Sequence, residues 1–332
     1  AVRCWQGTTG QYLYVVDLQT GALIRRFGPT GSPIVGSPSL WVGTPGAVST
    51  RAYVGDADGD VWRLDMSDPD PTRWRFAVSF DGFYDAGQMA GQPIVAPPVL
   101  SVDRNGDTLI AIGSGDPDLL EGFDRNLIAT YREAAVTDTA GAVTSVTASN
   151  VWQQRYGTDN TNGDLFAGER LTGNLSLFNG NLYFGTFVPA NSADSCQLGF
   201  SRLWGVDQVQ VVGGRPAARL DLDGDPSTTA DVVRVTQDIN GNGSITDDAN
   251  AVLFGVGIVR RPTCVTTTAT TDPYLGTPRQ FVDGMSGGDF RLVVQTGRGG
   301  SSAGGSRTNV VSRVIPPPIT ETSVKAWAVV FE

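Results

Sequence analysis

The sequence predicts an all-β fold. Helical periodicity is almost absent, whereas short apolar runs bounded by Gly, Asp, Asn or Pro recur along the chain, as expected for strands joined by tight turns. The composition agrees, because 40% of the 332 residues are hydrophobic, only 17% are charged and 42 are glycine. All-β folds of this length often form one unit and no stretch resembles a linker, so we expect a single domain over residues 1–332.

Some of the predicted strands form an imperfect repeat. A strand ends in Gly or Val, a polar turn follows, and a second strand carries an aromatic residue three positions before an Asp, as in Trp62 before Asp65 and Trp204 before Asp207. Radial repetition of four-stranded units is how β-propellers protect their sheet edges, and we therefore predict a propeller. A β-sandwich with long loops is the structural alternative. The expected strands are 12–16, 51–54, 61–64, 108–112, 181–185, 202–206, 290–294 and 324–330.

Two segments interrupt this pattern. Residues 132–164 are rich in Thr, Ala, Ser and Asn, and we expect one long exposed loop there between two blades. A second inserted loop is expected over residues 208–250, and it contains the best motif in the chain.

The distribution of charge disfavours nucleic acid as a partner. The net charge is −10, and Lys325 is the only lysine beside arginines that are scattered singly, so no basic stripe is present to neutralise a phosphate backbone. The acidic residues gather in loops rich in Asp, Asn and Gly, an arrangement typical of cation binding.

The residue types that are missing exclude most enzyme classes. The chain has no histidine, which removes Ser-His-Asp and Cys-His catalysis and histidine-ligated zinc. Paired acids would suit a glycosidase, but each attractive Asp pair lies in an exposed polar loop that lowers the pKa of its carboxyl groups. We therefore expect no enzymatic activity. The seven tryptophans fit core positions better than a carbohydrate-binding surface.

The three cysteines are too few and too far apart for a zinc or iron–sulfur site. One disulfide and one odd thiol are the natural interpretation, and we favour a Cys196–Cys264 disulfide with Cys4 as the odd thiol. No apolar run approaches the ~20 residues of a transmembrane helix. The N-terminus has no signal-peptide hydrophobic region, so we expect that the chain is a mature, processed or excised part of something longer.

The best candidate for a calcium-binding loop spans residues 238–248. A loop of the EF-hand type needs oxygen donors at alternating positions, a Gly at the sharp turn, a backbone carbonyl at position seven and a closing carboxylate. The usual closing position holds Ala249, so Asp247 or Asp248 must close the ring; the competing interpretation is a solvated turn. The remaining ligands are predicted to be Asp238, Asn240, Asn242 and the carbonyl of Ser244.

A second, shorter calcium candidate lies just upstream, where Pro226 replaces the turn-forming Gly. Its predicted ligands are Asp221, Asp223, Asp225 and Asp231. The segments 56–60 and 103–107 look similar but lack a closing acid at the right distance, and we predict that both are hairpin turns.

The sequence resembles the C-terminal propeller of the PilY-type adhesins, which are carried at the tips of type IV pili. The pieces that carry the resemblance follow one another in the family's order. They are 10–24, 53–65, 92–99, 112–115, 196–207, 238–244 and 255–259.

The resemblance implies a modified quinoprotein-like propeller with a role in pilus assembly and extension and in attachment to surfaces or host ligands. It also implies minor pilins and the pilus tip complex as partners, an exported location at the pilus tip or outer surface, and Ca²⁺ as the regulatory ion. The family's best-known calcium loop should precede the strand at 53–56, but residues 43–51 hold no carboxylate there. The blades that normally precede Gly10 are also missing, so we expect the chain to begin partway round a propeller.

Two other functions compete with a pilus-tip protein. A quinone-dependent propeller dehydrogenase would need an adjacent cysteine pair, and the cysteines of this chain are never adjacent. A calcium-dependent surface lectin or matrix protein would bind glycans without any association with pili.

Overall fold

The chain folds into consecutive antiparallel sheets with almost no helix. The structure is a computed structural model, and the all-β prediction is confirmed, because the helical elements are a 3₁₀ turn at Pro71–Arg73 and one turn, α1, at Gly82–Asp85 within the described residues. The described residues are 9–42, 47–85, 91–116, 124–137, 143–157, 164–189, 199–221, 229–235, 252–260, 270–271, 278–279, 290–297 and 310–315.

The first sheet is a four-stranded meander in which each strand pairs with the next along the chain. The predicted strands at 51–54 and 61–64 are its two central members. Its strands are β3 (Ser39–Trp41), β4 (Arg51–Gly55), β5 (Asp60–Asp65) and β6 (Arg75–Asp81).

The second sheet repeats this order, and it corrects one expectation. Most of the segment 132–164 is not an exposed loop, because it contains the end of β9 and all of β10, which pair as a long antiparallel hairpin. Tyr131, Glu133 and Trp152 on this hairpin are buried, and the hairpin packs on both neighbouring sheets. The polar composition of the segment did not indicate this pair of strands. The strands are β7 (Val99–Val102), β8 (Thr108–Gly113), β9 (Leu127–Thr137) and β10 (Val143–Arg155).

The third sheet is built around β13 and β14, which contain the predicted strands at 181–185 and 202–206. Part of the second expected loop, 208–250, is also strand, because β14 continues to Val212 and β15 and β18 pair with it. The strands are β11 (Arg170–Leu171), β12 (Ser176–Phe178), β13 (Asn181–Val188), β14 (Phe200–Val212), β15 (Arg215–Ala218) and β18 (Val232–Val235).

A two-stranded N-terminal hairpin precedes these sheets and a fourth sheet follows them, with two short ladders beside it. The hairpin is β1 (Leu13–Val16) with β2 (Leu23–Phe27). The fourth sheet is β19 (Val252–Arg260), β22 (Phe290–Gly297) and β23 (Val310–Ile315). The ladders are β16 (Leu220–Asp221) with β17 (Thr229–Ala230), and β20 (Thr270–Thr271) with β21 (Pro278–Arg279). The predicted strand at 324–330 lies outside the described residues.

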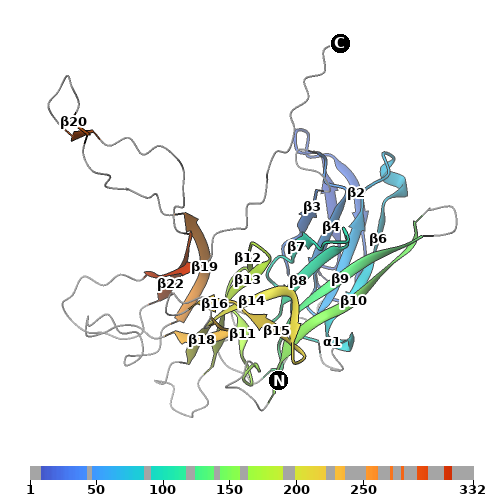
Figure 1. The fold of residues 1–332 in the computed structure, drawn as a ribbon. Helices are drawn as coiled ribbons and strands as arrows, with labels where there is room; N and C mark the ends of the chain where they lie inside the picture. The colour runs from blue at the N-terminus through green and yellow to red at the C-terminus, as the bar shows by residue number, and fades with distance from the viewer. Residues whose placement is uncertain are drawn as a thin grey trace.

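The core is divided into layers, each between two consecutive sheets. Alternate residues of one strand serve different layers: Ile110 packs between the first and second sheets, and Ala111 between the second and third. A third layer joins the third sheet to the fourth, and a fourth joins the N-terminal hairpin to the first sheet. Both faces of the central strands are therefore covered, which explains their continuous apolar runs. Figure 1 shows the sheets following one another from β2 to β22, as in a propeller.

None of the helices in the described residues has the length and apolar character of a membrane span.

Candidate functional site

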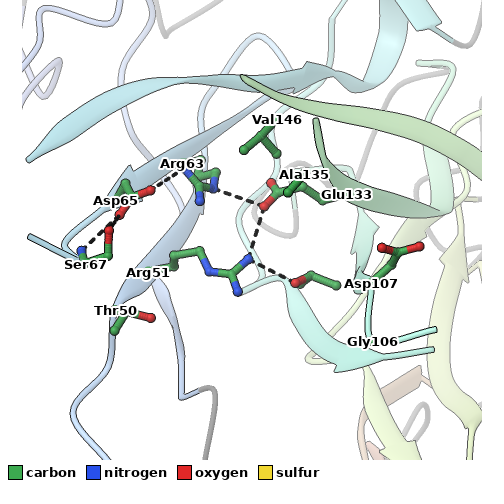
Figure 2. A pocket seen from close by; sticks show the side chains of 11 residues that line it. Thr50, Arg51, Arg63, Asp65, Ser67, Gly106, Asp107, Glu133, Ala135 and Val146 are labelled. Carbon is green, nitrogen blue, oxygen red and sulfur yellow. Dashed lines mark hydrogen bonds and ion pairs between the residues drawn. The ribbon is translucent and has the colours of Figure 1, made fainter. Parts of the chain in front are cut away.

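A pocket of about 370 Å³ opens between the first and second sheets (Figure 2). The starts of β4 and β8 and the end of β5 meet there, and the turn between β7 and β8 closes one side. Volumes of this order are typical of sites for small molecules. The lining residues are Thr50, Arg51, Arg63, Asp65, Ser67, Gly106, Asp107, Thr108, Glu133, Ala135 and Val146.

The base of the pocket is the carboxylate of Glu133, whose side chain is 2% exposed. Tyr53 donates its hydroxyl to Oε1 at 2.7 Å, and Arg63 donates Nε to the same oxygen at 3.0 Å. Ser79 donates to Oε2 at 3.0 Å. These three donors come from β4, β5 and β6, so one residue of the second sheet is bound by three strands of the first.

This network keeps both Tyr53 and Arg63 protonated, the first as a neutral phenol and the second as a cation. Burial, followed by the Glu133 charge, raises the pKa of Tyr53 to about 12, so the phenol stays protonated. Burial lowers the pKa of Arg63, but Glu133, Tyr53 and Asp65 together outweigh burial, and the pKa lies above the ordinary value. Both oxygens of Glu133 accept hydrogen bonds from the first sheet, so this carboxylate joins the two sheets.

The rim of the pocket is set by Arg51. Its guanidinium lies over the ring of Trp41, 5.6 Å from the ring centroid, and its Nη1 donates to the hydroxyl of Thr108 at 3.1 Å. The same nitrogen reaches Glu133 at 3.4 Å. Figure 2 shows Arg51 with the side chain of Asp107 beyond it. The site therefore offers charged and hydroxyl groups to a ligand at the rim, above an ion network that is already satisfied.

A second buried glutamate stabilises the third sheet. Glu169 is fully buried and forms an ion pair of 2.8 Å with Arg202, while Thr186 donates to its other oxygen. Arg202 also lies over the ring of Trp204 at 4.5 Å. Since an unpaired buried charge is costly, this arrangement is structural.

The two hairpin turns predicted from Asp-rich segments are confirmed. Asp56 joins β4 to β5 and accepts the backbone amides of Asp58 and Asp60 at 3.0 Å each. Asp103 joins β7 to β8 in the same way, with the amides of Asn105 and Asp107. Oδ1 of each leading Asp thus holds its own turn, as the turn chemistry of Asp predicts. Oδ2 of Asp56 accepts from the indole of Trp62, and Oδ2 of Asp103 pairs with Arg132.

The first turn also concentrates negative charge. Asp60 on β5 lies directly opposite Asp81 on β6, and like charges in that position repel. Burial, followed by the charges of Asp56, Asp81 and Asp58, raises the pKa of Asp60 to about 7. Burial also raises the pKa of Asp56.

The predicted calcium ligands remain predictions. All six residues of the 238–248 candidate, and Asp223 and Asp225 of the other, lie outside the described residues, as do the three cysteines. The backbone of Asp221 is paired with Thr229 at the base of a hairpin, and the carbonyl of Asp231 accepts the amide of Gly205 at 3.0 Å. Within the described residues no three acidic or cysteine side chains form a metal-binding group.

The pocket was not foreseen from the sequence, although one signal was present. Only five of the 34 acidic residues are glutamates, whereas the aspartates gather in turns. Glu133 and Glu169 are the two glutamates in the described part of the chain, and both are buried in ion pairs. The rarity of Glu in a chain rich in Asp is therefore the signal that points to these networks.

Comparison with known proteins gives consistent relatives. A family model described as the PilY1 beta-propeller domain matches residues 3–169. Two curated proteins named type IV pilus biogenesis factor PilY1, from two strains of Pseudomonas aeruginosa, are 30% identical to this chain in an alignment of 174 residues that covers 43% of this chain. The match spans only 15% of the length of those relatives. The crystal structure of the Pseudomonas aeruginosa PilY1 C-terminal domain aligns with a TM-score of 0.46 at 16% identity, over 75% of this chain and 64% of that one.

Proposed function

This chain belongs to the PilY1 β-propeller family, and on that premise we propose that it is a non-enzymatic module of a type IV pilus protein. Its proposed role is attachment to a surface or host ligand at the pilus tip, together with pilus assembly and extension. The observation that carries the proposal is the family match over residues 3–169, half of the chain. The proposed location is outside the cell, and the proposed partners are minor pilins.

The location is tested by immunogold labelling of piliated cells with antibodies to this chain. We expect gold particles at filament tips, and none on a strain that lacks the gene. Label confined to the cytoplasm would contradict the proposal.

Calcium binding is the second part of the proposal and rests on the sequence of the 238–248 loop, in which Asp238, Asn240 and Asn242 alternate as oxygen donors. Isothermal titration with CaCl₂ should show a site that Asp238→Ala weakens. Asp221→Ala tests the shorter candidate separately. An unchanged titration for both variants would mean that these segments are only turns.

We also propose that residues 1–332 form one domain, since each described sheet shares a core layer with the next. Within the part of the chain that the structure describes, no residue arrangement favours a quinone dehydrogenase over the pilus role. A direct assay with pyrroloquinoline quinone and an artificial electron acceptor should give no turnover.

A further inference from the structure

The rim of the pocket between the first and second sheets has one cation and one anion with unused hydrogen-bonding capacity. Arg51 uses Nη1 for Thr108 and Glu133, and within the described residues neither its Nη2 nor its Nε has a hydrogen-bond partner. The carboxylate of Asp107 makes no hydrogen bond or ion pair with any residue in the described part of the chain. Both groups line the same pocket.

The remaining charges of the pocket are already engaged. Arg63 donates to Glu133 and forms a 3.0 Å ion pair with Asp65, whose other oxygen accepts the amide and hydroxyl of Ser67. A ligand therefore meets Nη2 and Nε of Arg51 and the carboxylate of Asp107 as groups of opposite sign with unused hydrogen-bonding capacity.

This pairing selects against charged ligands. An anion attracted to Arg51 is repelled by Asp107, and a cation attracted to Asp107 is repelled by Arg51. A neutral molecule with several hydroxyl groups gains from both, since a hydroxyl both donates to a carboxylate and accepts from a guanidinium. The hydroxyls of Thr50 and Thr108 add donors and acceptors at the same rim.

The pocket also has an apolar wall. Ala135 on β9 and Val146 on β10 are cross-strand partners that both line the pocket, and they offer a surface to the C–H groups of a ring. From this combination we propose that the pocket binds a neutral sugar residue at the end of a glycan. The volume of about 370 Å³ lies near the lower limit of small-molecule sites, which favours one or two sugar rings over a longer chain.

The proposal deepens the attachment role proposed above and rests on it for its biological meaning. It differs from a calcium-dependent lectin, because none of the groups that it uses belongs to a predicted calcium loop. The binding measurement uses the purified chain without pili, so its failure is distinguishable from a failure of tip labelling.

The test is saturation-transfer NMR of the chain in EDTA with glucose, galactose, mannose, fucose and N-acetylglucosamine, each followed by titration to a Kd. N-acetylneuraminic acid is the charged comparison. We expect saturable binding of at least one neutral sugar and weaker binding of the anionic one. No saturable binding of any neutral sugar, or tighter binding of the anionic sugar, would overturn the proposal.

Two pocket variants locate the site. Asp107→Ala removes a hydrogen-bond acceptor that has no partner in the described structure, so the fold should be retained while the Kd rises about tenfold. Ala135→Leu fills the apolar wall and should have a similar or larger effect. Arg104→Gln, in the same turn but outside the pocket lining, is the control and should leave the Kd unchanged. Equal affinity in all three variants would place the sugar elsewhere and contradict the proposal.

Discussion

At the scale of single residues, Glu133 joins two sheets by accepting hydrogen bonds from three strands of the other sheet. Removing its charge leaves Arg63, which is 16% exposed, without its buried partner. We expect Glu133→Gln to lower the free energy of unfolding by about 3 kcal/mol, measured by urea denaturation. The control is Asp65→Asn, which removes the more exposed partner of the same arginine and should cost less than about 1 kcal/mol. Equal effects would contradict a structural role for Glu133.

A second residue-scale prediction concerns Asp60, whose pKa is raised to about 7 by burial and by three neighbouring carboxylates. The folded state then binds the proton more tightly than the unfolded chain, whose value is 3.8. The free energy of unfolding therefore falls as the pH rises from the unfolded value towards 7. Asp60→Asn should flatten this slope and stabilise the protein at pH 8 by about 1 kcal/mol, a figure reduced for solvent screening of a half-buried group.

The control for Asp60 is Asp17→Asn. Hydrogen bonds from Thr20 lower the pKa of Asp17 in the folded state. The contribution of Asp17 to the free energy of unfolding is therefore lost only when the pH falls below the pKa of Asp17 in the unfolded chain. Urea denaturation between pH 5 and pH 7 should therefore show the same slope for Asp17→Asn as for the unsubstituted chain. An unchanged slope in Asp60→Asn would contradict the prediction.

At the scale of elements, the two Asp-led hairpins offer a matched pair of glycines. Gly59 and Gly106 both have positive φ, +90° and +87°, in turns of the same kind. A Cβ at Gly59 would lie 2.3 Å from Cδ2 of the buried Phe83, whereas a Cβ at Gly106 meets nothing within 4 Å.

Gly59→Ala and Gly106→Ala should therefore both strain the backbone, but only Gly59→Ala should also create a clash with Phe83. Gly106→Ala should cost about 1–2 kcal/mol for the left-handed backbone. Gly59→Ala should cost about 2 kcal/mol more, because α1 and the ring of Phe83 must move within a packed core. Urea denaturation measures both, and equal costs would contradict the packing at Gly59.

Local sequence pattern predicts some strands of this fold and misses others. Strands flanked by Asp/Gly turns, such as β4, β5 and β8, were predicted within one residue or so, because turn residues mark their ends. The hairpin of β9 and β10 was missed, because its polar and small residues face neighbouring sheets as well as solvent. Likewise the pocket depends on Arg51, Arg63 and Glu133, which are up to 82 residues apart in sequence and meet only through sheet packing.

At the scale of the whole molecule, each apolar layer joins only neighbouring sheets. Leu253 on β19 is fully buried against the third sheet, where its Cδ2 occupies the position that a Cβ at Gly185 would need. Ile112 on β8 is buried in the layer between the first and second sheets. Truncating either side chain to alanine should cost about 2–5 kcal/mol within its own layer.

Because the layers are separate, the two truncations should open different parts of the protein. Leu253→Ala should increase amide hydrogen exchange in β13, β19 and β22 and leave β4 and β5 protected, since local opening follows the contacts that are lost. Ile112→Ala should give the opposite pattern, with faster exchange in β4, β8 and β9. Hydrogen exchange followed by mass spectrometry resolves the two cases. A uniform increase in hydrogen exchange across all sheets in both variants would contradict this prediction. It would mean that the layers unfold as one unit and that the stability of a sheet does not depend mainly on its direct neighbours.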